Sequence, residues 1–170
     1  GELNAAYPKI HVLLNNAGVL KRHREENAEG RELVFAINHL GPFLLTNLLL
    51  DHIKAAGHAR IVNVASTAHK GGRINFEDLE SKQKFGMWPA YSQSKLANVL
   101  FTKELARRLD GGQVTANALH PGVVATNLFT GAAGFFAPII SLFLISSEVG
   151  AYTSVYLASS PEVDGISGKY

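Results

Sequence analysis

The sequence contains no cysteine among its 170 residues, and only one tryptophan and one methionine. The absence of cysteine excludes a disulfide framework, a thiolate nucleophile and a zinc site built on thiolates. An excess of charge of one sign is also missing, because 16 basic and 14 acidic residues leave a net charge of +2. The sequence therefore gives no sign of a basic face that would bind nucleic acid. With 46% hydrophobic and 18% charged residues, the composition is that of a globular protein, and we expect its partner to be a small molecule.

A run long enough to span a membrane is missing too. The one long apolar stretch, residues 131–147, is shorter than the ~20 residues of a span and contains Pro138. We expect it to form a buried or interfacial helix on the substrate side, with contact to a membrane surface as the alternative. Residues 1–9 lack the apolar core of a secretory signal, and the chain begins as though within a domain. These features predict an intracellular protein, either cytoplasmic or peripheral to a membrane.

Apolar runs alternate with longer helix-like segments along the chain, which is typical of βαβ units. Residues 10–14, 60–65 and 113–119 are short and rich in β-branched residues, so they are predicted as buried parallel strands. The other predicted elements are a helix over 29–56 with a bend at Gly41-Pro42, a helix with the apolar stripe Ala97, Phe101, Leu105 and Leu109, a helix over 148–159, and the start of a last strand at 168–170.

Tyr91 and Lys95 are four residues apart near the start of the second predicted helix, so both side chains lie on one face. Lowering a phenol pKa from about 10 to ~7 takes about 4 kcal/mol of preferential phenolate stabilisation. An ammonium group at about 4 Å supplies roughly that amount at an effective dielectric constant of about 20. The pair is therefore a candidate acid–base centre. The alternative is a surface tyrosine beside a solvated lysine, which is the commoner meaning of an isolated pair.

Polar residues follow each predicted strand, at the edge where parallel strands bind ligands. The Ser66 hydroxyl, after the second strand, can hold a substrate oxygen or, alternatively, cap the next turn. Residues 15–18 follow the first strand, and Pro121-Gly122 with Thr126 a few residues on follow the third. The three strand ends thus predict one ligand site, although each alone could be an ordinary turn.

Asn38 lies within an otherwise apolar predicted helix, where a buried amide without a partner costs ~1–3 kcal/mol. It belongs either to a structural hydrogen-bond network or to a proton relay, in which it anchors a water next to the lysine. His39, His69 and His120 show no metal-ligand spacing. We interpret these histidines as structural or loop residues and propose no metal site.

Five motifs, in order, resemble those of the short-chain dehydrogenase/reductase family: NNAG at 15–18, Asn38, Ser66, YSQSK at 91–95 and HPGVVAT at 120–126. The resemblance covers essentially the whole chain. Residues 38–46 and 91–98 are most similar to the retinol-dehydrogenase-like branch. The resemblance implies a doubly wound parallel sheet of the Rossmann type and an oxidoreductase that transfers a hydride between NAD(P)(H) and a carbonyl or alcohol.

The resemblance also implies a role for each matched residue. Tyr91 would be the general acid/base, Ser66 would orient the substrate oxygen, and Lys95 would bind the nicotinamide ribose and lower the pKa of Tyr91. Asn38 would complete the proton relay. The remaining cofactor contacts would be Asn15, Asn16, Ala17 and Gly18 on the adenosine side, and Pro121, Gly122, Val124 and Thr126 around the nicotinamide.

The apolar segment after Thr126 is similar to the variable substrate lid of the family. It favours a lipophilic alcohol or aldehyde, for which a retinoid or a steroid is the candidate. The lid residues would be Phe129, Phe135, Phe136, Ile139, Leu142 and Phe143.

The sequence departs from the family pattern in its first part. The first three family strands, the glycine-rich phosphate turn and the residue that selects NAD or NADP have no counterpart. We therefore expect a partial Rossmann-type sheet in a single partial domain over residues 1–170, and the choice between NAD and NADP stays open. Ala65 replaces a serine of many relatives, next to the matching Ser66.

Two other functions stay open. A truncated, non-catalytic chain could act as an interaction module or pair with a full-length relative, and the chain could also form a homo-oligomer. An epimerase or dehydratase that acts on a sugar nucleotide would use the same tyrosine and lysine. The NNAG and HPGVVAT motifs argue against this last alternative.

Overall fold

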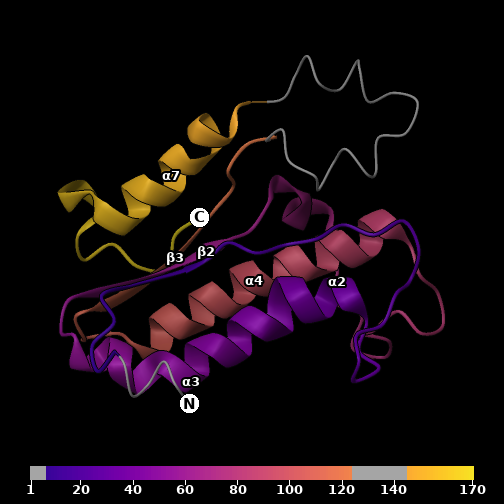
Figure 1. The fold of residues 1–170 in the computed structure, drawn as a ribbon, viewed down its shortest axis with the longest axis horizontal. Coiled ribbons are helices and arrows are strands. Elements are labelled where there is room, and N and C mark those ends of the chain that lie inside the picture. Colours follow the sequence, from indigo (N-terminus) through magenta and orange to yellow (C-terminus); the bar gives the residue numbers. More distant parts are fainter. Residues whose placement is uncertain (1–6, 124–144) are drawn as a thin grey trace.

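The fold is built on a parallel sheet of three strands in the order β1-β2-β3. The computed structural model describes residues 7–123 and 145–170 (Figure 1). The strands are β1 (Val12–Asn15), β2 (Ala59–Val64) and β3 (Val114–Leu119). All three predicted strands are confirmed. Their bounds differ from the prediction by no more than two residues.

Helices cover both faces of the sheet, as a doubly wound fold requires (Figure 1). The helices α3 (Gly41–Ala55) and α4 (Met87–Arg108) lie against one face, and α7 (Ser147–Ser159) lies against the other. Two 3-10 helices, η2 (Thr67–Gly71) and η4 (Pro161–Val163), follow β2 and α7. The helix predicted with the apolar stripe of residues 97–109 and the helix predicted over 148–159 are confirmed as α4 and α7.

The main core lies between the sheet and the pair of helices α3 and α4. Its buried side chains include Leu49 and Ile53 of α3, Leu105 of α4, Ile61 of β2 and Ala116 of β3. A smaller cluster on the other face joins β2 and β3 to α7. The predicted apolar stripe of α4 therefore faces the sheet.

The first predicted helix begins later than expected and is irregular. It consists of α2 (Leu33–Phe35), a π-helical turn η1 (Ala36–Leu40) and then α3. The start moves from residue 29 to 33 because the Glu32 carboxylate accepts hydrogen bonds from the backbone N–H groups of Val34 and Phe35 and so caps the helix. The irregular turn directly precedes Gly41-Pro42, where the sequence predicts a bend.

The last residues do not form the regular strand that we expected at 168–170. They run along β3, where Gly168 N–H donates to Ala116 O at 2.8 Å and Ala118 N–H donates to Lys169 O at 2.9 Å. Side chains interrupt the backbone ladder, because Asn117 Nδ2 donates to Ile166 O at 2.7 Å and Asn117 Oδ1 accepts from Lys169 N–H at 3.0 Å.

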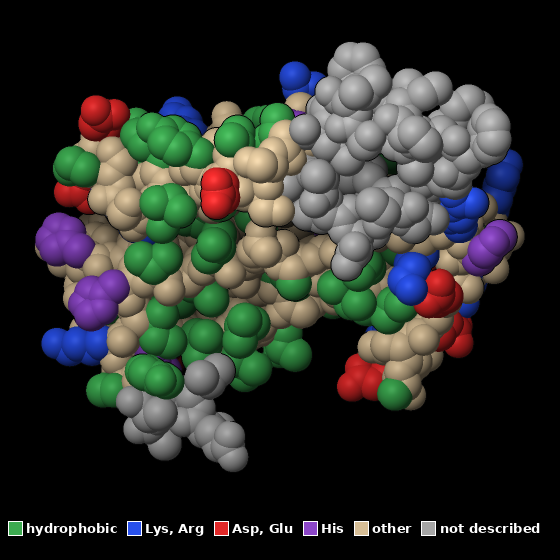
Figure 2. Space-filling model, turned by 45° about the horizontal axis from the view of Figure 1, so that its top comes forward, with side chains coloured by type: hydrophobic (Ala, Val, Ile, Leu, Met, Phe, Trp, Pro, Cys, Tyr) green, Lys and Arg blue, Asp and Glu red, His purple; other side chains and the backbone are tan. Residues whose placement is uncertain are grey.

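Strand β1 is the least covered strand of the described sheet. Val12 and Leu14 are 44% and 41% exposed, whereas Ile61 and Val62 of β2 are at most 1% exposed. In the space-filling view, hydrophobic side chains lie across the middle of the face, and most charged groups lie toward its ends (Figure 2). The described structure thus leaves apolar surface beside β1.

Among the described residues, one helical segment, Leu33–Ala55, is long and apolar enough to cross a membrane. Leu49 and Ile53 of this segment pack in the main core, whereas Leu44 and Leu48 are more than half exposed. The apolar stretch at 131–147 falls mostly outside the described residues. So do Val124, Thr126 and the predicted lid residues Phe129, Phe135, Phe136, Ile139, Leu142 and Phe143.

Candidate active site

A cavity of about 790 Å³ lies at the carboxyl ends of the three strands. The structure brings most of the predicted site residues that it describes to this cavity; its lining includes Asn16, Ala17, Gly18, Ser66, Tyr91, Lys95, Pro121 and Gly122. A second cavity, of about 550 Å³, lies at the amino ends of the strands and is lined by none of them. The carboxyl edge is where a parallel sheet binds its ligand.

Tyr91 and Lys95 project from the first turns of α4 into the protein. Their exposed fractions are 4% and 3%, so the alternative of a solvated surface pair is wrong. Lys95 Nζ donates to the carbonyl oxygen of Val64 at 2.9 Å, at the end of β2. The same nitrogen lies 5.7 Å from the centre of the Tyr91 ring. Helix α4 therefore holds an ammonium group and a phenol at one edge of the sheet.

Burial controls the protonation of both groups. It lowers the pKa of the Lys95 ammonium to about 8. It raises the pKa of the Tyr91 phenol, and hydrogen bonding to Ser66 acts in the opposite direction. This differs from the lowered tyrosine pKa that the family resemblance implies, because in this structure the ammonium is hydrogen-bonded to Val64 and desolvation of the phenol dominates.

Ser66 stands two residues after the end of β2 and is 8% exposed. Its Oγ accepts a hydrogen bond from Ala68 N–H at 3.2 Å, so it caps η2, as the structural alternative predicted. The same residue lines the cavity together with Tyr91. A hydroxyl that accepts from the backbone still has its own hydrogen to donate, so the cap leaves Ser66 able to bind a substrate oxygen.

Asn38 is fully buried at 0% exposure, and its amide is satisfied by protein groups. Oδ1 accepts from Val19 N–H at 2.7 Å, and Nδ2 donates to Val19 O and to Ser94 Oγ, each at 3.0 Å. Ser94 Oγ in turn donates to Tyr91 O at 2.7 Å. The structural alternative for Asn38 thus has direct support, since this side chain joins the loop after β1 to the turn of α4 that carries Tyr91.

Asn15 is the one described residue of the predicted cofactor set that does not line the cavity. It is 8% exposed, and its Nδ2 donates to Asn63 Oδ1 at 2.7 Å and to Thr46 Oγ1 at 3.0 Å. Asn63 Nδ2 continues the chain of contacts to Thr102 Oγ1 at 2.9 Å. Asn15 therefore anchors the end of β1 to the interior.

Two glycines allow close approach at the cavity. A methyl group on Gly18 would lie 3.3 Å from Lys95 Nζ and 3.5 Å from Asn38 Oδ1. Gly122 has a φ of 86°, a left-handed conformation that favours glycine. The loops after β1 and β3 can thus pass close to the site with little side-chain bulk.

The sequence prediction missed the contribution of α7. Ser147, Gly150 and Ser154 from this helix line the cavity, and Gly150 and Ser154 are buried. Two small residues four positions apart in the predicted helix were the available signal, because such spacing forms a face that allows close packing. His120, interpreted from the sequence as a structural or loop residue, also lines the cavity.

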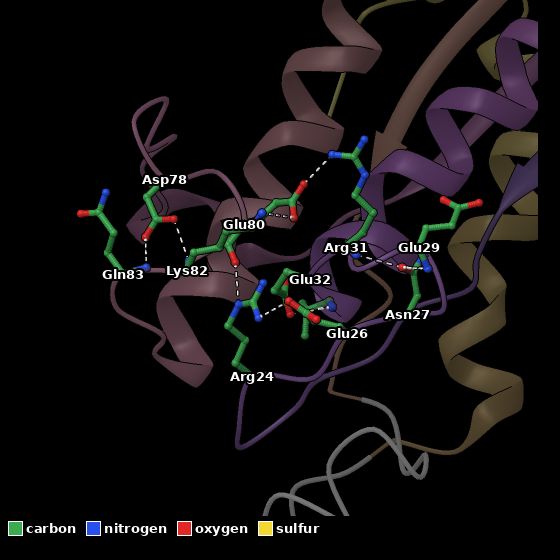
Figure 3. Close-up of polar contacts among 11 residues, drawn as sticks. Arg24, Glu26, Asn27, Glu29, Arg31, Glu32, Asp78, Glu80, Lys82 and Gln83 are labelled. Atoms are coloured by element: carbon green, nitrogen blue, oxygen red, sulfur yellow. Dashed lines mark hydrogen bonds and ion pairs between the residues drawn. The ribbon is translucent and has the colours of Figure 1, made fainter.

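An ion pair and a hydrogen bond join the two loops that precede α2 and α4 (Figure 3). Arg31 Nη1 binds Glu80 Oε1 at 2.7 Å, and Arg24 Nε donates to Glu80 O at 3.0 Å. Gln93, two residues after Tyr91, ties the second loop to α4, since its Nε2 donates to Leu79 O at 2.8 Å. These contacts hold the loop before α4 in place relative to α2 and to the first turns of α4.

The model of the short chain dehydrogenase family matches residues 1–133. Human (Homo sapiens) retinol dehydrogenase 14 is 50% identical over 169 residues, which cover 96% of this chain and 50% of that protein. The chain thus spans about half the length of the curated relatives it matches.

Solved structures show the same fold. A protein of Mycobacterium paratuberculosis is 41% identical, with a TM-score of 0.73 over 94% of this chain and 53% of that one. A gluconate 5-dehydrogenase of Beutenbergia cavernae with bound NADP is 28% identical, with a TM-score of 0.72 over 99% of this chain and 66% of that one. The predicted α/β fold with a parallel Rossmann-type sheet is confirmed. The chain belongs to the short-chain dehydrogenase/reductase family and is similar to its retinol dehydrogenases.

Proposed function

We propose that this chain forms the catalytic part of an oxidoreductase that interconverts an alcohol and a carbonyl compound with a nicotinamide cofactor. The observation that carries the proposal is the meeting of Ser66, Tyr91 and Lys95 at one cavity on the carboxyl edge of the sheet. The residues are far apart in sequence, so a shared site is a stronger argument than any one motif. Membership of the family supports the same reaction class.

The cavity suits a nicotinamide cofactor. Its lining combines an ammonium group, two glycine-containing loops and small residues of α7, which leave space for a planar ring and a ribose. When bound, the cofactor supplies or accepts the hydride. In this proposal Asn16, Ala17 and Gly18 adjoin the adenosine half, and Pro121 and Gly122, followed by Val124 and Thr126, adjoin the nicotinamide. The proposal covers NAD and NADP alike.

Tyr91 is the proposed general acid/base. In the direction of reduction its hydroxyl gives a proton to the carbonyl oxygen, which Ser66 holds by a hydrogen bond. In the direction of oxidation the phenolate form of Tyr91 takes the proton of the alcohol and becomes the neutral phenol. Tyr91 is poised for the neutral, proton-donating form, because burial raises its pKa. Lys95 would exchange its hydrogen bond to the Val64 carbonyl for hydrogen bonds to the ribose hydroxyls. Its positive charge would then stabilise the phenolate form of Tyr91 and lower the pKa of Tyr91.

The proposed substrate is a lipophilic alcohol or aldehyde of the retinoid or steroid kind. The similarity to retinol dehydrogenases supports this substrate class. The apolar side chains of Leu14, Ile37 and Val155 in the cavity lining also support it. The phenylalanines that follow Thr126 would add to this apolar surface.

A second candidate is a non-catalytic interaction module. The observation that favours it is the exposed apolar surface of β1, where Val12 and Leu14 are each more than 40% exposed. An uncovered strand edge can pair with another chain. The same surface is also compatible with further strands of a longer enzyme.

The deciding experiment is to assay an enzyme that contains this chain with all-trans-retinal and NADH or NADPH, beside its Lys95→Ala variant. We expect turnover in the parent, and a loss of both turnover and cofactor affinity in the variant. Turnover of a sugar nucleotide instead would support the epimerase alternative. An absence of both turnover and cofactor binding in the parent would support the interaction module.

A further inference from the structure

The carbonyl group of Asn38 cannot accept the hydrogen bond that a regular α-helix would give it from the residue four positions later. Pro42 stands four residues later and has no N–H to donate. A side chain supplies the donor instead, because Asn98 Nδ2 lies 2.8 Å from the Asn38 carbonyl oxygen. Asn98 is only 4% exposed. Since a buried carbonyl needs a donor, this contact binds α4 to the irregular turn η1.

Asn98 is itself oriented by His39. Its Oδ1 lies 3.0 Å from His39 Nδ1. Because Nδ2 of Asn98 donates to Asn38, its Oδ1 is the acceptor toward His39, and we assign the ring hydrogen to His39 Nδ1. The ring is held between Phe35 and Phe101, with centroids at 5.2 Å and 6.2 Å. Burial lowers the pKa of His39, which keeps the ring neutral near pH 7.

The Asn38 side chain reaches the proposed catalytic groups by two routes. One runs through Ser94 to the backbone of Tyr91. The other is proximity alone, because a methyl group placed on Gly18 would lie 3.5 Å from Asn38 Oδ1 and 3.3 Å from Lys95 Nζ. A displacement of Asn38 would therefore change the surroundings of both Tyr91 and Lys95.

We propose that Asn98, oriented by His39, is a positioning residue that holds the carbonyl freed by Pro42 and thereby fixes the Asn38 amide against the turn that carries Tyr91 and Lys95. The proposal rests on the proposed function for the catalytic meaning of that turn. Asn98 acts through Asn38, and it does not line the cavity.

Substitutions by uncharged residues at Asn98 and His39 test this proposal. Asn98→Ala removes the donor to Asn38, and His39→Leu removes the group that orients Asn98. His39→Asn keeps an N–H near the place of Nδ1 and should restore the contact. The control is Asn47→Ala, because Asn47 Nδ2 also donates to a helix carbonyl, that of Phe43 at 2.7 Å, but on the exposed side of α3.

Two measurements are made on these variants. The titration of Lys95 is followed by NMR of labelled lysine side chains in the 170-residue chain. In an enzyme that contains the chain, kcat and KM are measured with retinal. We expect Asn98→Ala and His39→Leu to move the Lys95 pKa by about half a unit or more and to lower kcat by about tenfold or more with little change in KM. His39→Asn and Asn47→Ala should stay close to the parent.

The outcomes separate the two proposals. A parental Lys95 titration and kcat in folded Asn98→Ala and His39→Leu would overturn the inference. If Asn98→Ala does not fold, the comparison of His39→Leu with His39→Asn decides, and equal values for these two would overturn it. If Tyr91→Phe keeps full turnover while Asn98→Ala still shifts the Lys95 titration, the proposed function fails and the positioning contact stands.

Discussion

The helices α3 and α4 build two different interiors against the same strands. Toward the amino ends of the strands the interior is apolar, with Ile61 at 0% exposure among leucines and isoleucines. Toward the carboxyl ends it is polar and hydrogen-bonded, with Asn15, Asn38, Thr46, Asn63, Ser94, Asn98 and Thr102 all buried.

The difference separates two tasks. Apolar packing is non-directional, so residues of similar size can replace one another at a cost of ~1.5 kcal/mol or less. A buried amide must meet its partners at defined distances and angles, so the polar interior accepts one arrangement and excludes others. The polar end adjoins the cavity. The directional hydrogen bonds are therefore concentrated where the loops that line the cavity need fixed positions.

The largest expected effect separates chemistry from stability at the polar end. In an enzyme that contains this chain, Tyr91→Phe should lower kcat by roughly 10²- to 10⁴-fold, because only the proton-transferring hydroxyl is lost. Cofactor affinity and the free energy of unfolding should change little. Turnover within tenfold of the parent would refute the role of Tyr91, and calorimetric titration with NADH and NADPH checks the affinity.

The next effect belongs to the apolar end. Ile61→Ala should lower the free energy of unfolding by about 2–5 kcal/mol, because it removes buried methyl and methylene groups and leaves a cavity. The pKa of Lys95 should stay as in the parent, since Ile61 does not line the cavity that contains Lys95. Urea denaturation measures the first quantity. A decrease in the free energy of unfolding of less than about 1 kcal/mol would show that neighbouring side chains fill the space left by Ile61→Ala.

The sequence predicted the apolar end and the meeting of site residues better than it predicted the polar end. Short β-branched runs gave the strands, and the motifs around Ser66 and Tyr91 gave residues that do line one cavity. Both signals are local in sequence. The role of Asn98 was missed because its partner Asn38 lies 60 positions away.

The start of the first helix and the irregular turn depended on specific hydrogen bonds. Glu32 caps α2 with a carboxylate, a cap outside the usual short polar residues. The π-helical turn η1 exchanges regular helix hydrogen bonds for a contact with α4. Periodicity reports which face of a helix is apolar, and it carries no information on such exchanges.

Lys95 makes the stability of the polar end depend on pH. Its pKa is about 8 in the folded chain and about 10.5 when unfolded, so between these values the unfolded state binds more protons. Stability should therefore rise with pH, by about 2.5 kcal/mol between pH 7 and 10. Urea denaturation at several pH values should show this rise in the parent and in the exposed-site control Lys54→Met. A rise that persists in Lys95→Met would assign it to another group.

The smallest of these effects tests how closely η2 packs against α4, and two neighbouring glycines allow a matched comparison. A methyl group on Gly72 would lie 2.5 Å from the backbone oxygen of Ser92, directly after Tyr91, whereas a methyl group on Gly71 meets nothing within 4 Å. Backbone cannot rotate away as a side chain can, so Gly72→Ala should cost about 1–3 kcal/mol of unfolding free energy and push η2 from α4. Gly71→Ala should be close to neutral, because its φ is not positive. Thermal melts of the two variants measure the difference, and equal melting temperatures would show that η2 moves freely against the turn that carries Tyr91.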